Sequence, residues 1–196
     1  MIKDATTYEI MNPEDYGVSS VLTFGARSGS AALRGRYNAM GLEVDDFSLC
    51  AERFFTIADT RKEIDDADVV MSVYGGEIDE KYHLENFHPI VNGEFRAAVE
   101  IGLSSSKFCS QISGGNGQID AAFNAIKQAT DVNYDLIDFR VRSDGRGSDS
   151  EGISRIEMSN GQYFVIGISQ GTDVVTSAIE AYIDGCNRLA YIEEVM

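Results

Sequence analysis

Apolar residues in the N-terminal part of the chain recur every three or four positions, which is the spacing of amphipathic helices. This spacing predicts three helices, over residues 28–41, 46–60 and 66–73. Gly75 and Gly76 then interrupt the helical pattern, because neighbouring glycines weaken a helix. The interruption predicts a boundary between a helical part and a second part of different structure.

Beyond these glycines the pattern changes to short apolar runs, rich in β-branched and aromatic residues, that are separated by turn residues. The runs predict strands over 84–91, 95–103 and 107–112 with a helix over 119–130, then strands over 134–142, 153–158 and 163–169 with a helix over 173–189. Asn92-Gly93 and Asn160-Gly161 are typical of hairpin turns. The same β-β-β-α order therefore occurs twice.

The two predicted closing helices begin in a similar way. Gly115 precedes an acid at Asp120, and Gly171 precedes an acid at Asp173; the two acids are 53 residues apart (173 − 120), and we expect them to begin equivalent helices. One such unit can barely bury its own apolar face, whereas two copies share a core. The seam between copies, or between chains, is then a natural ligand site.

The predicted fold class is α+β, with a small helical subdomain followed by a domain of two β-β-β-α repeats. Residues 1–22 contain Pro13 and are expected to form an extended connector. The helical subdomain is expected over residues 23–76 and the repeat domain over 77–196.

Composition excludes some partners. The 196 residues carry 32 acidic and 16 basic side chains, a formal charge of −16, which argues against nucleic acid and anionic membranes. The three cysteines, Cys50, Cys109 and Cys186, have neither disulfide nor zinc-site spacing, so we expect free thiols in a reducing compartment. The N-terminus lacks the apolar run of a signal peptide, and no stretch approaches membrane-spanning length, so we expect a cytoplasmic protein.

The segment from Ser113 to Asp120 is the first candidate site. Its glycines let a ligand approach the backbone, and the helix that follows has first-turn N–H groups that can bind a carboxylate. The alternative is a plain strand-to-helix turn in which Asp120 is a capping or first-turn acid. Both interpretations stay open on the residues alone.

Other polar residues give weaker signals. His83 and His88 are five positions apart in a predicted strand, which predicts opposite faces and no shared metal. The acids between Asp144 and Glu151 lack the spacing of a calcium loop. The chain shows no Ser-His-Asp set and no nucleotide fingerprint, so its residues indicate a binding or assembly protein without catalytic residues of its own.

Seven segments of the chain match a known family in fixed order: 7–15 (TYEIMNPED), 24–33 (FGARSGSAAL), 54–64 (FFTIADTRKEI), 115–125, 135–141 (DLIDFRV), 147–149 (GSD) and 171–189. Together they resemble the 2-isopropylmalate synthases. The chain is thereby similar to the C-terminal part of these enzymes, which comprises a helical communication subdomain and a regulatory domain.

This resemblance implies a feedback module of leucine biosynthesis. In the family a catalytic barrel binds a divalent metal and condenses acetyl-CoA with 2-oxoisovalerate, and it has no counterpart in this sequence. We therefore expect no cofactor in this chain and no such reaction by this chain alone. The resemblance implies that leucine binds between the regulatory domains of a homodimer and acts on the barrel through the helices between residues 28 and 73.

The resemblance also implies a set of effector-binding residues: Gly115, Asn116, Gly117, Gln118, Ile119, Leu136, Phe139, Ser143, Ser150 and Gly152. The family usually has Asp, Pro, Tyr and Ala at positions 116, 118, 139 and 150. Many members carry His where Arg27 stands, a residue thought to assist the partner subunit's active site.

Three alternatives remain. The same architecture occurs in citramalate synthase, whose effector is isoleucine, although residues 8–11 (YEIM) favour the isopropylmalate side. A free-standing amino-acid-binding or assembly module would have no parent barrel. An independent enzyme that uses His83 or His88 would require these two side chains to converge in one pocket.

Overall fold

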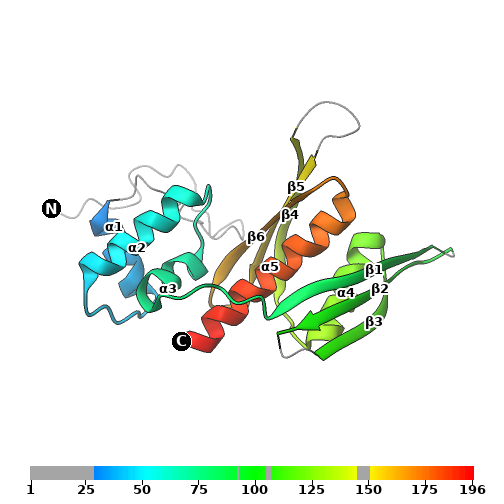
Figure 1. Ribbon diagram of the computed structural model, residues 1–196, viewed down its shortest axis with the longest axis horizontal. Helices are drawn as coiled ribbons and strands as arrows, with labels where there is room; N and C mark the ends of the chain where they lie inside the picture. Colours follow the sequence, from blue (N-terminus) through cyan, green and yellow to red (C-terminus); the bar gives the residue numbers. More distant parts are fainter. Residues whose placement is uncertain (1–28, 92, 105–106, 145–150) are drawn as a thin grey trace, which may run out of the picture.

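The computed structural model describes residues 29–91, 93–104, 107–144 and 151–196, and it confirms the predicted α+β fold (Figure 1). Three helices come first: α1 (Ser30–Ala39), α2 (Phe47–Thr60) and α3 (Asp66–Tyr74). They lie together beside the strand-containing part of the molecule. The expected connector over 1–22 lies outside the described residues.

Side-chain caps explain where two of these helices begin. The carboxylate of Asp46 accepts hydrogen bonds from the N–H groups of Ser48 and Leu49, so α2 starts immediately after it. Asp65 and Asp68 form a reciprocal capping box at the start of α3. At the other end, Gly75 has φ +76°, a conformation that glycine adopts without strain, and α3 stops there.

The rest of the chain forms two β-β-β-α units. The first comprises β1 (Tyr82–Val91), β2 (Phe95–Leu103), β3 (Lys107–Gly115) and α4 (Gln118–Thr130); the second comprises β4 (Asp135–Asp144), β5 (Glu151–Ser159), β6 (Phe164–Gly171) and α5 (Val174–Val195). Each unit has an antiparallel sheet in sequential order, β1-β2-β3 or β4-β5-β6. The predicted repeat is confirmed.

β3 is longer than predicted and includes Gly114 and Gly115 of the predicted ligand segment. Gly115 is its last residue and pairs with Phe95 of β2. A Cβ atom on Gly115 would lie 2.4 Å from the backbone nitrogen of Ala121, so no other residue fits between the strand end and the helix. Gly115 therefore allows a tight strand-to-helix connection.

The first strands of the two repeats share a sequence and an irregularity. Residues 82–87 (YHLENF) and 134–139 (YDLIDF) carry Tyr, Leu and Phe at matching positions, and each strand has a register shift, between Leu84 and Asn86 and between Leu136 and Asp138. Such a bulge adds one residue to a strand and reverses the alternation of side chains beyond it.

This bulge corrects the prediction for the two histidines. His83 pairs with Gly102 and His88 pairs with Ala98; these partners are four residues apart, so both histidines lie on the same face and not on opposite faces. Four residues of strand still separate them by about 13 Å. His83 instead contacts Glu85, with 2.7 Å between Nε2 and Oε1.

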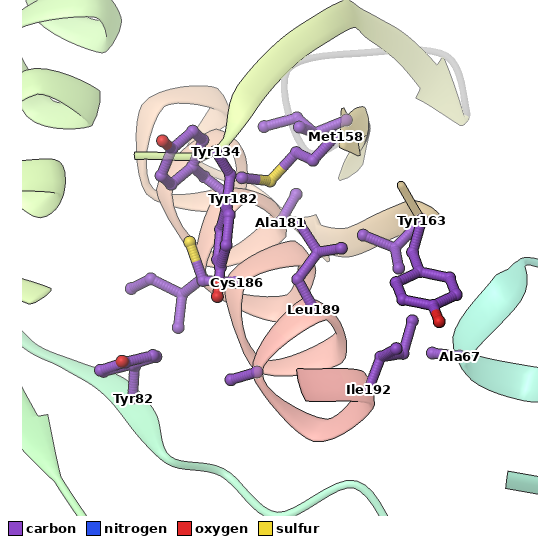
Figure 2. Close-up of a cluster of buried hydrophobic side chains, with 14 of the residues drawn as sticks. Ala67, Tyr82, Tyr134, Met158, Tyr163, Ala181, Tyr182, Cys186, Leu189 and Ile192 are labelled. Atoms are coloured by element: carbon purple, nitrogen blue, oxygen red, sulfur yellow. The ribbon is translucent and has the colours of Figure 1, made fainter. Parts of the chain in front are cut away.

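The core centres on α5, which runs diagonally across the molecule toward the N-terminal helices (Figure 1). Figure 2 shows Tyr182 of α5 on the side of Tyr134, and Ile192 on the side of Ala67 from α3. All four side chains are buried. Because α5 contributes buried side chains toward both Tyr134 and Ala67, it joins the second repeat to the helical part. None of the helices among the described residues has the length and apolar character needed to cross a bilayer.

The three thiols are free, as expected. Cys50 and Cys186 are buried in the core, and Cys109 is half-buried on β3. Burial raises the pKa of the Cys186 thiol, so this side chain stays protonated and packs as a small apolar group.

Candidate functional site

A pocket of about 570 Å³ opens where the two repeats meet. It is lined by residues from the start of α4, from strands of both sheets and from the start of α5: Phe95, Gly117, Gln118, Ile119, Asp120, Phe123, Leu136, Phe139 and Val175. Its size is within the range of small-molecule sites, and most of its walls are apolar. The seam between the repeats therefore holds a pocket, as the repeat architecture suggests.

Aromatic rings form one side of this pocket. Phe123 of α4 meets Phe139 of β4 edge to face, with ring centroids 6.0 Å apart. On its other side Phe123 stacks on Tyr182 of α5, with centroids 4.4 Å apart. Phe123 and Tyr182 are buried, whereas Phe95 and Leu136 are 44% and 40% exposed. The pocket thus combines a fixed aromatic base with exposed apolar walls.

The start of α4 supplies the polar end of the pocket. Gly117 is the N-cap residue and has no side chain to accept hydrogen bonds, so within the described part of the chain no side chain caps the N–H groups of Gln118 and Ile119. The carboxylate of Asp120 turns back instead and accepts the N–H of Asn116, with 2.8 Å between N and Oδ2. Asp120 is therefore a first-turn acid and not the N-cap.

The second repeat differs at the corresponding position. Asp173 is the N-cap of α5, and its carboxylate accepts the N–H groups of Val175 and Thr176. The strand-end glycines, Gly115 and Gly171, are 56 residues apart, and the same offset relates Gly117 to Asp173. The expected equivalence of Asp120 and Asp173 is therefore wrong, because Asp173 is the N-cap of its helix whereas Asp120 lies three residues after the N-cap Gly117.

Asp120 is the only ionisable side chain among the described residues that line the pocket. The pocket consequently offers backbone N–H groups to a carboxylate and one carboxylate to an ammonium group. Apolar walls surround both. This combination suits a small molecule with an apolar side chain and opposite charges at one end, which is the chemistry of an aliphatic amino acid.

The structure brings together five of the ten predicted effector-binding residues, namely Gly117, Gln118, Ile119, Leu136 and Phe139. Their role in binding stays a prediction.

The other five lie outside this lining. Gly115 and Asn116 immediately precede it. Gly152 on β5 lies near Val174, since a Cβ atom there would be 3.3 Å from its Cγ2. Ser143 is a residue of β4 whose side chain lies outside the described residues, as do Ser150 and Arg27.

The predicted effector-binding set left out four lining residues, Phe95, Asp120, Phe123 and Val175, although Asp120 ends the candidate segment from Ser113 to Asp120. The sequence repeat could have identified Val175, because the 56-residue offset makes this residue the counterpart of Ile119. Phe95 had no such signal, since it reaches the pocket only through the pairing of β2 with β3. Among the described residues, no group of three His, Cys, Asp or Glu side chains is placed to hold a metal ion.

The chain thus carries two β-β-β-α repeats with a pocket between them, and comparisons identify its class. Residues 62–190 match the family described as "LeuA allosteric (dimerisation) domain", and residues 1–62 match "Homocitrate synthase post-HMGL domain-like". The chain belongs to the family of LeuA allosteric (dimerisation) domains. Membership of a dimerisation-domain family supports the expectation of a homodimer.

Full-length relatives agree. The chain is 31% identical over 193 residues to the 2-isopropylmalate synthase of Xanthomonas campestris pv. campestris (strain B100), covering 96% of this chain and 37% of that enzyme. It is 31% identical to the 2-isopropylmalate synthase of Heliobacterium modesticaldum, covering 97% and 38%, and 28% identical to that of Salinibacter ruber, covering 99% and 40%. The chain corresponds to the C-terminal regulatory part of these enzymes and spans about two fifths of their length.

Proposed function

We propose that the chain binds leucine, or a closely related branched-chain amino acid, as a feedback effector in the pocket at the start of α4. The observation that carries this proposal is the junction of an apolar pocket with a helix start that has no side-chain cap. Backbone N–H groups at a helix start bind carboxylates well, because the helix dipole adds to their hydrogen bonds.

In this proposal each part of the amino acid has a partner. Its carboxylate accepts the N–H groups of Gln118 and Ile119, and its ammonium group lies near Asp120. Its aliphatic side chain packs against Phe123 and Phe139. Burying a leucine side chain contributes about 1.5–3 kcal/mol, and charge-assisted hydrogen bonds add to it and set the orientation.

Exposed apolar side chains next to the pocket indicate that the pocket lies at the homodimer interface in this proposal. Phe95 and Leu136 line the pocket and are 44% and 40% exposed; Val141 of β4 and Val174 of α5 are 43% and 40% exposed. Val174 precedes Val175, which lines the pocket. An apolar surface of this kind is typical of a contact with another chain. A second copy covering it would also close the pocket.

We further propose that the module regulates a catalytic barrel that condenses acetyl-CoA with a 2-oxo acid, with a divalent metal bound in that barrel. The similarity to three 2-isopropylmalate synthases over nearly the whole chain supports this parent reaction. The chain by itself would then be catalytically inactive and free of cofactor. A cytoplasmic location follows from this role in amino-acid biosynthesis.

Calorimetric titration of the chain with leucine, isoleucine and valine tests the proposal, at a protein concentration where sedimentation detects a dimer. We expect saturable binding that favours leucine. The variant Gly117→Val should lose binding but stay folded, because a Cβ atom at Gly117 meets no atom within 4 Å and its side chain would enter the pocket.

The matched control is Gly29→Val. Gly29 is also an N-cap without a side-chain bond and with open space at its Cβ, but it belongs to α1. This variant should bind leucine as the original chain does. Selectivity for isoleucine would instead identify a citramalate synthase module. A folded dimer that binds none of the three amino acids would contradict the proposal, as would unchanged affinity in Gly117→Val.

A further inference from the structure

A cluster of buried charges joins the helical part of the chain to the second repeat. Arg188 of α5 is bound by Asp65, the N-cap of α3, through two hydrogen bonds: Nε to Oδ2 at 2.6 Å and Nη2 to Oδ1 at 2.7 Å. The same Nη2 lies 2.6 Å from Oδ1 of Asp68, which also accepts from Arg61 at 3.3 Å. The side chains of Asp65 and Asp68 are 0% exposed and that of Arg188 is 3% exposed.

The first turn of α3 is also bonded to the edge of the second sheet. Asp65 Oδ2 accepts the N–H of Ile166 at 2.8 Å, and Asp66 Oδ2 accepts the N–H of Phe164 at 2.9 Å. Both N–H groups belong to β6, which is an edge strand. Carboxylates of α3 thus take the positions of carbonyl groups from a neighbouring strand, and they fix α3 against both β6 and α5.

The buried charges fix the orientation of α3 against α5 more than they add to the stability of the fold. Burial opposes the charge on Arg188, but Asp65 and Asp68 outweigh burial and raise the pKa of its guanidinium. Burial, reinforced by Asp65, raises the pKa of Asp68 above its ordinary value. Buried ion pairs often contribute little net stability, because removing charges from water costs about as much as their attraction returns. A bidentate arginine–carboxylate contact does fix the relative orientation and register of the two helices.

The other end of α5 reaches the pocket. Val175, in the first turn of α5, lines it, and Arg188 lies 13 residues further along the same helix (188 − 175), or about 20 Å at the helical rise. Two neighbours of Arg188 bind other segments: Asn187 bonds the backbone of Tyr82 in β1, and the Tyr191 hydroxyl donates to the carbonyl of Gly75 at 2.9 Å. One helix therefore contacts the pocket, both sheets and the end of α3.

We propose that α5 couples occupancy of the pocket to the helices α1–α3 through the contact of Arg188 with Asp65 and Asp68. This inference rests on the proposed effector binding. A ligand that contacts α5 at Val175 can shift the position of α5. The bidentate contact of Arg188 with Asp65 then makes α3 move with α5. Such coupling is a free-energy difference between two arrangements and is carried by a discrete, packed connection.

Hydrogen exchange of the full 196-residue chain, with and without leucine, tests the inference. In the original chain we expect leucine to slow amide exchange in α3 by about fivefold or more, which is the lower end of typical coupling. In Arg188→Lys the charge remains but the bidentate contact with Asp65 is lost. We expect this variant to keep its leucine affinity within about twofold while leucine no longer slows exchange in α3.

A control and a second variant keep the test decisive. Glu180→Gln is the control: Glu180 lies on the same helix between the pocket and the cluster, and among the described residues its side chain bonds only Ser169 of its own repeat. This variant should keep the effect of leucine on α3. If Arg188→Lys fails to fold, the triple variant Asp65→Asn, Asp68→Asn, Arg188→Met removes the cluster without leaving an unpaired buried charge.

The outcomes separate the two proposals. Leucine binding without any change in α3 exchange in the original chain would overturn the coupling and leave the effector site standing. Slowed α3 exchange in a folded Arg188→Lys or triple variant would overturn it as well. A chain that does not bind leucine would contradict the proposed function and, with it, the coupling.

Discussion

Gly117 and Asp173 occupy the same position in the two repeats, and each is the N-cap of the helix that closes its repeat. The carboxylate of Asp173 accepts two N–H groups of its own helix, whereas Gly117 has no side chain to accept the corresponding groups of α4, those of Ile119 and Asp120, which are residues of the pocket lining. The second repeat thus carries in its own chain the carboxylate that the first repeat would receive from a ligand. If the proposed effector binding is correct, this difference predicts one effector site per chain instead of two.

Gly117→Asp tests this relationship directly. The new carboxylate should cap α4 as Asp173 caps α5, so the free energy of unfolding should stay equal or rise by a few tenths of a kcal/mol. It should also occupy the N–H groups of Ile119 and Asp120, the counterparts of Val175 and Thr176, and repel the carboxylate of leucine. We expect leucine affinity to fall about tenfold or more, the equivalent of one charge-assisted hydrogen bond.

Calorimetry measures this affinity, and thermal unfolding measures the stability. Gly29→Asp is the matched control, because it introduces the same acid at the N-cap of α1, outside the pocket lining. It should change net charge equally without changing leucine affinity. Wild-type affinity in a folded Gly117→Asp variant would show that the start of α4 does not hold the effector.

The cap at Asp173 should also give a pH-dependent contribution to stability. Its hydrogen bond with Thr176 is the main cause that lowers the pKa of Asp173 below 3.8. An acid whose pKa is lower in the folded state stabilises the fold above its unfolded pKa, and the contribution is lost as pH falls through the folded pKa. Asp173→Ala should therefore cost about 1 kcal/mol at pH 7 and less at pH 3.

Urea unfolding at several pH values between 7 and 3 measures this cost, as the difference in unfolding free energy between Asp173→Ala and the original chain. Asp173→Asn is the control, because an asparagine caps without titrating. A cost of Asp173→Ala that stays constant down to pH 3 would mean that the ionised carboxylate does not contribute to the cap.

Close packing of α5 on β6 requires glycine at position 167. A Cβ atom on Gly167 of β6 would lie 2.0 Å from the carbonyl oxygen of Ala181 and 2.7 Å from the nitrogen of Gly185, so the helix would have to move away. We expect Gly167→Ala to lower the free energy of unfolding by about 1–3 kcal/mol. Chemical denaturation measures the change.

The same substitution should have the opposite sign at Gly35. This glycine lies inside α1, and a Cβ atom there meets no atom within 4 Å. Gly35→Ala should therefore raise stability by about 0.5–1 kcal/mol through the higher helix propensity of alanine. If Gly167→Ala were equally neutral or stabilising, the close approach of α5 to β6 would be wrong.

Local patterns determined the order of helices and strands, because apolar spacing and turn residues act over a few positions. They did not reveal the bulge between Leu84 and Asn86, since nothing in these residues distinguishes an unpaired residue from a paired one. Local patterns indicated the pocket only at the start of α4, and the family resemblance added Leu136 and Phe139 of β4. The pocket wall at Phe95 and the contact of Arg188 with Asp65, 123 residues apart, depend on tertiary packing that no local pattern encodes.

Asn187 provides a last test of how the repeats are joined. Its side-chain amide accepts the N–H of Tyr82 and donates to the carbonyl of Tyr82, both at 2.8 Å, and so replaces a missing strand at the start of β1. Asn187→Leu should leave two buried backbone groups without partners, at a cost of about 1–3 kcal/mol for each. Exchange at the amide of Tyr82 should become faster along with this loss of stability.

Asn124→Leu is the control that tests whether burial of the hydrogen bonds causes the loss of stability expected in Asn187→Leu. Asn124 of α4 also donates from a helix to a strand carbonyl, that of Gly114, but this hydrogen bond is exposed and water can replace it. Its loss should cost well under about 1 kcal/mol. Because both substitutions place the same residue on a closing helix, equal costs in urea unfolding would mean that the amide of Asn187 adds nothing beyond ordinary helix packing, and that β1 is held by its sheet alone.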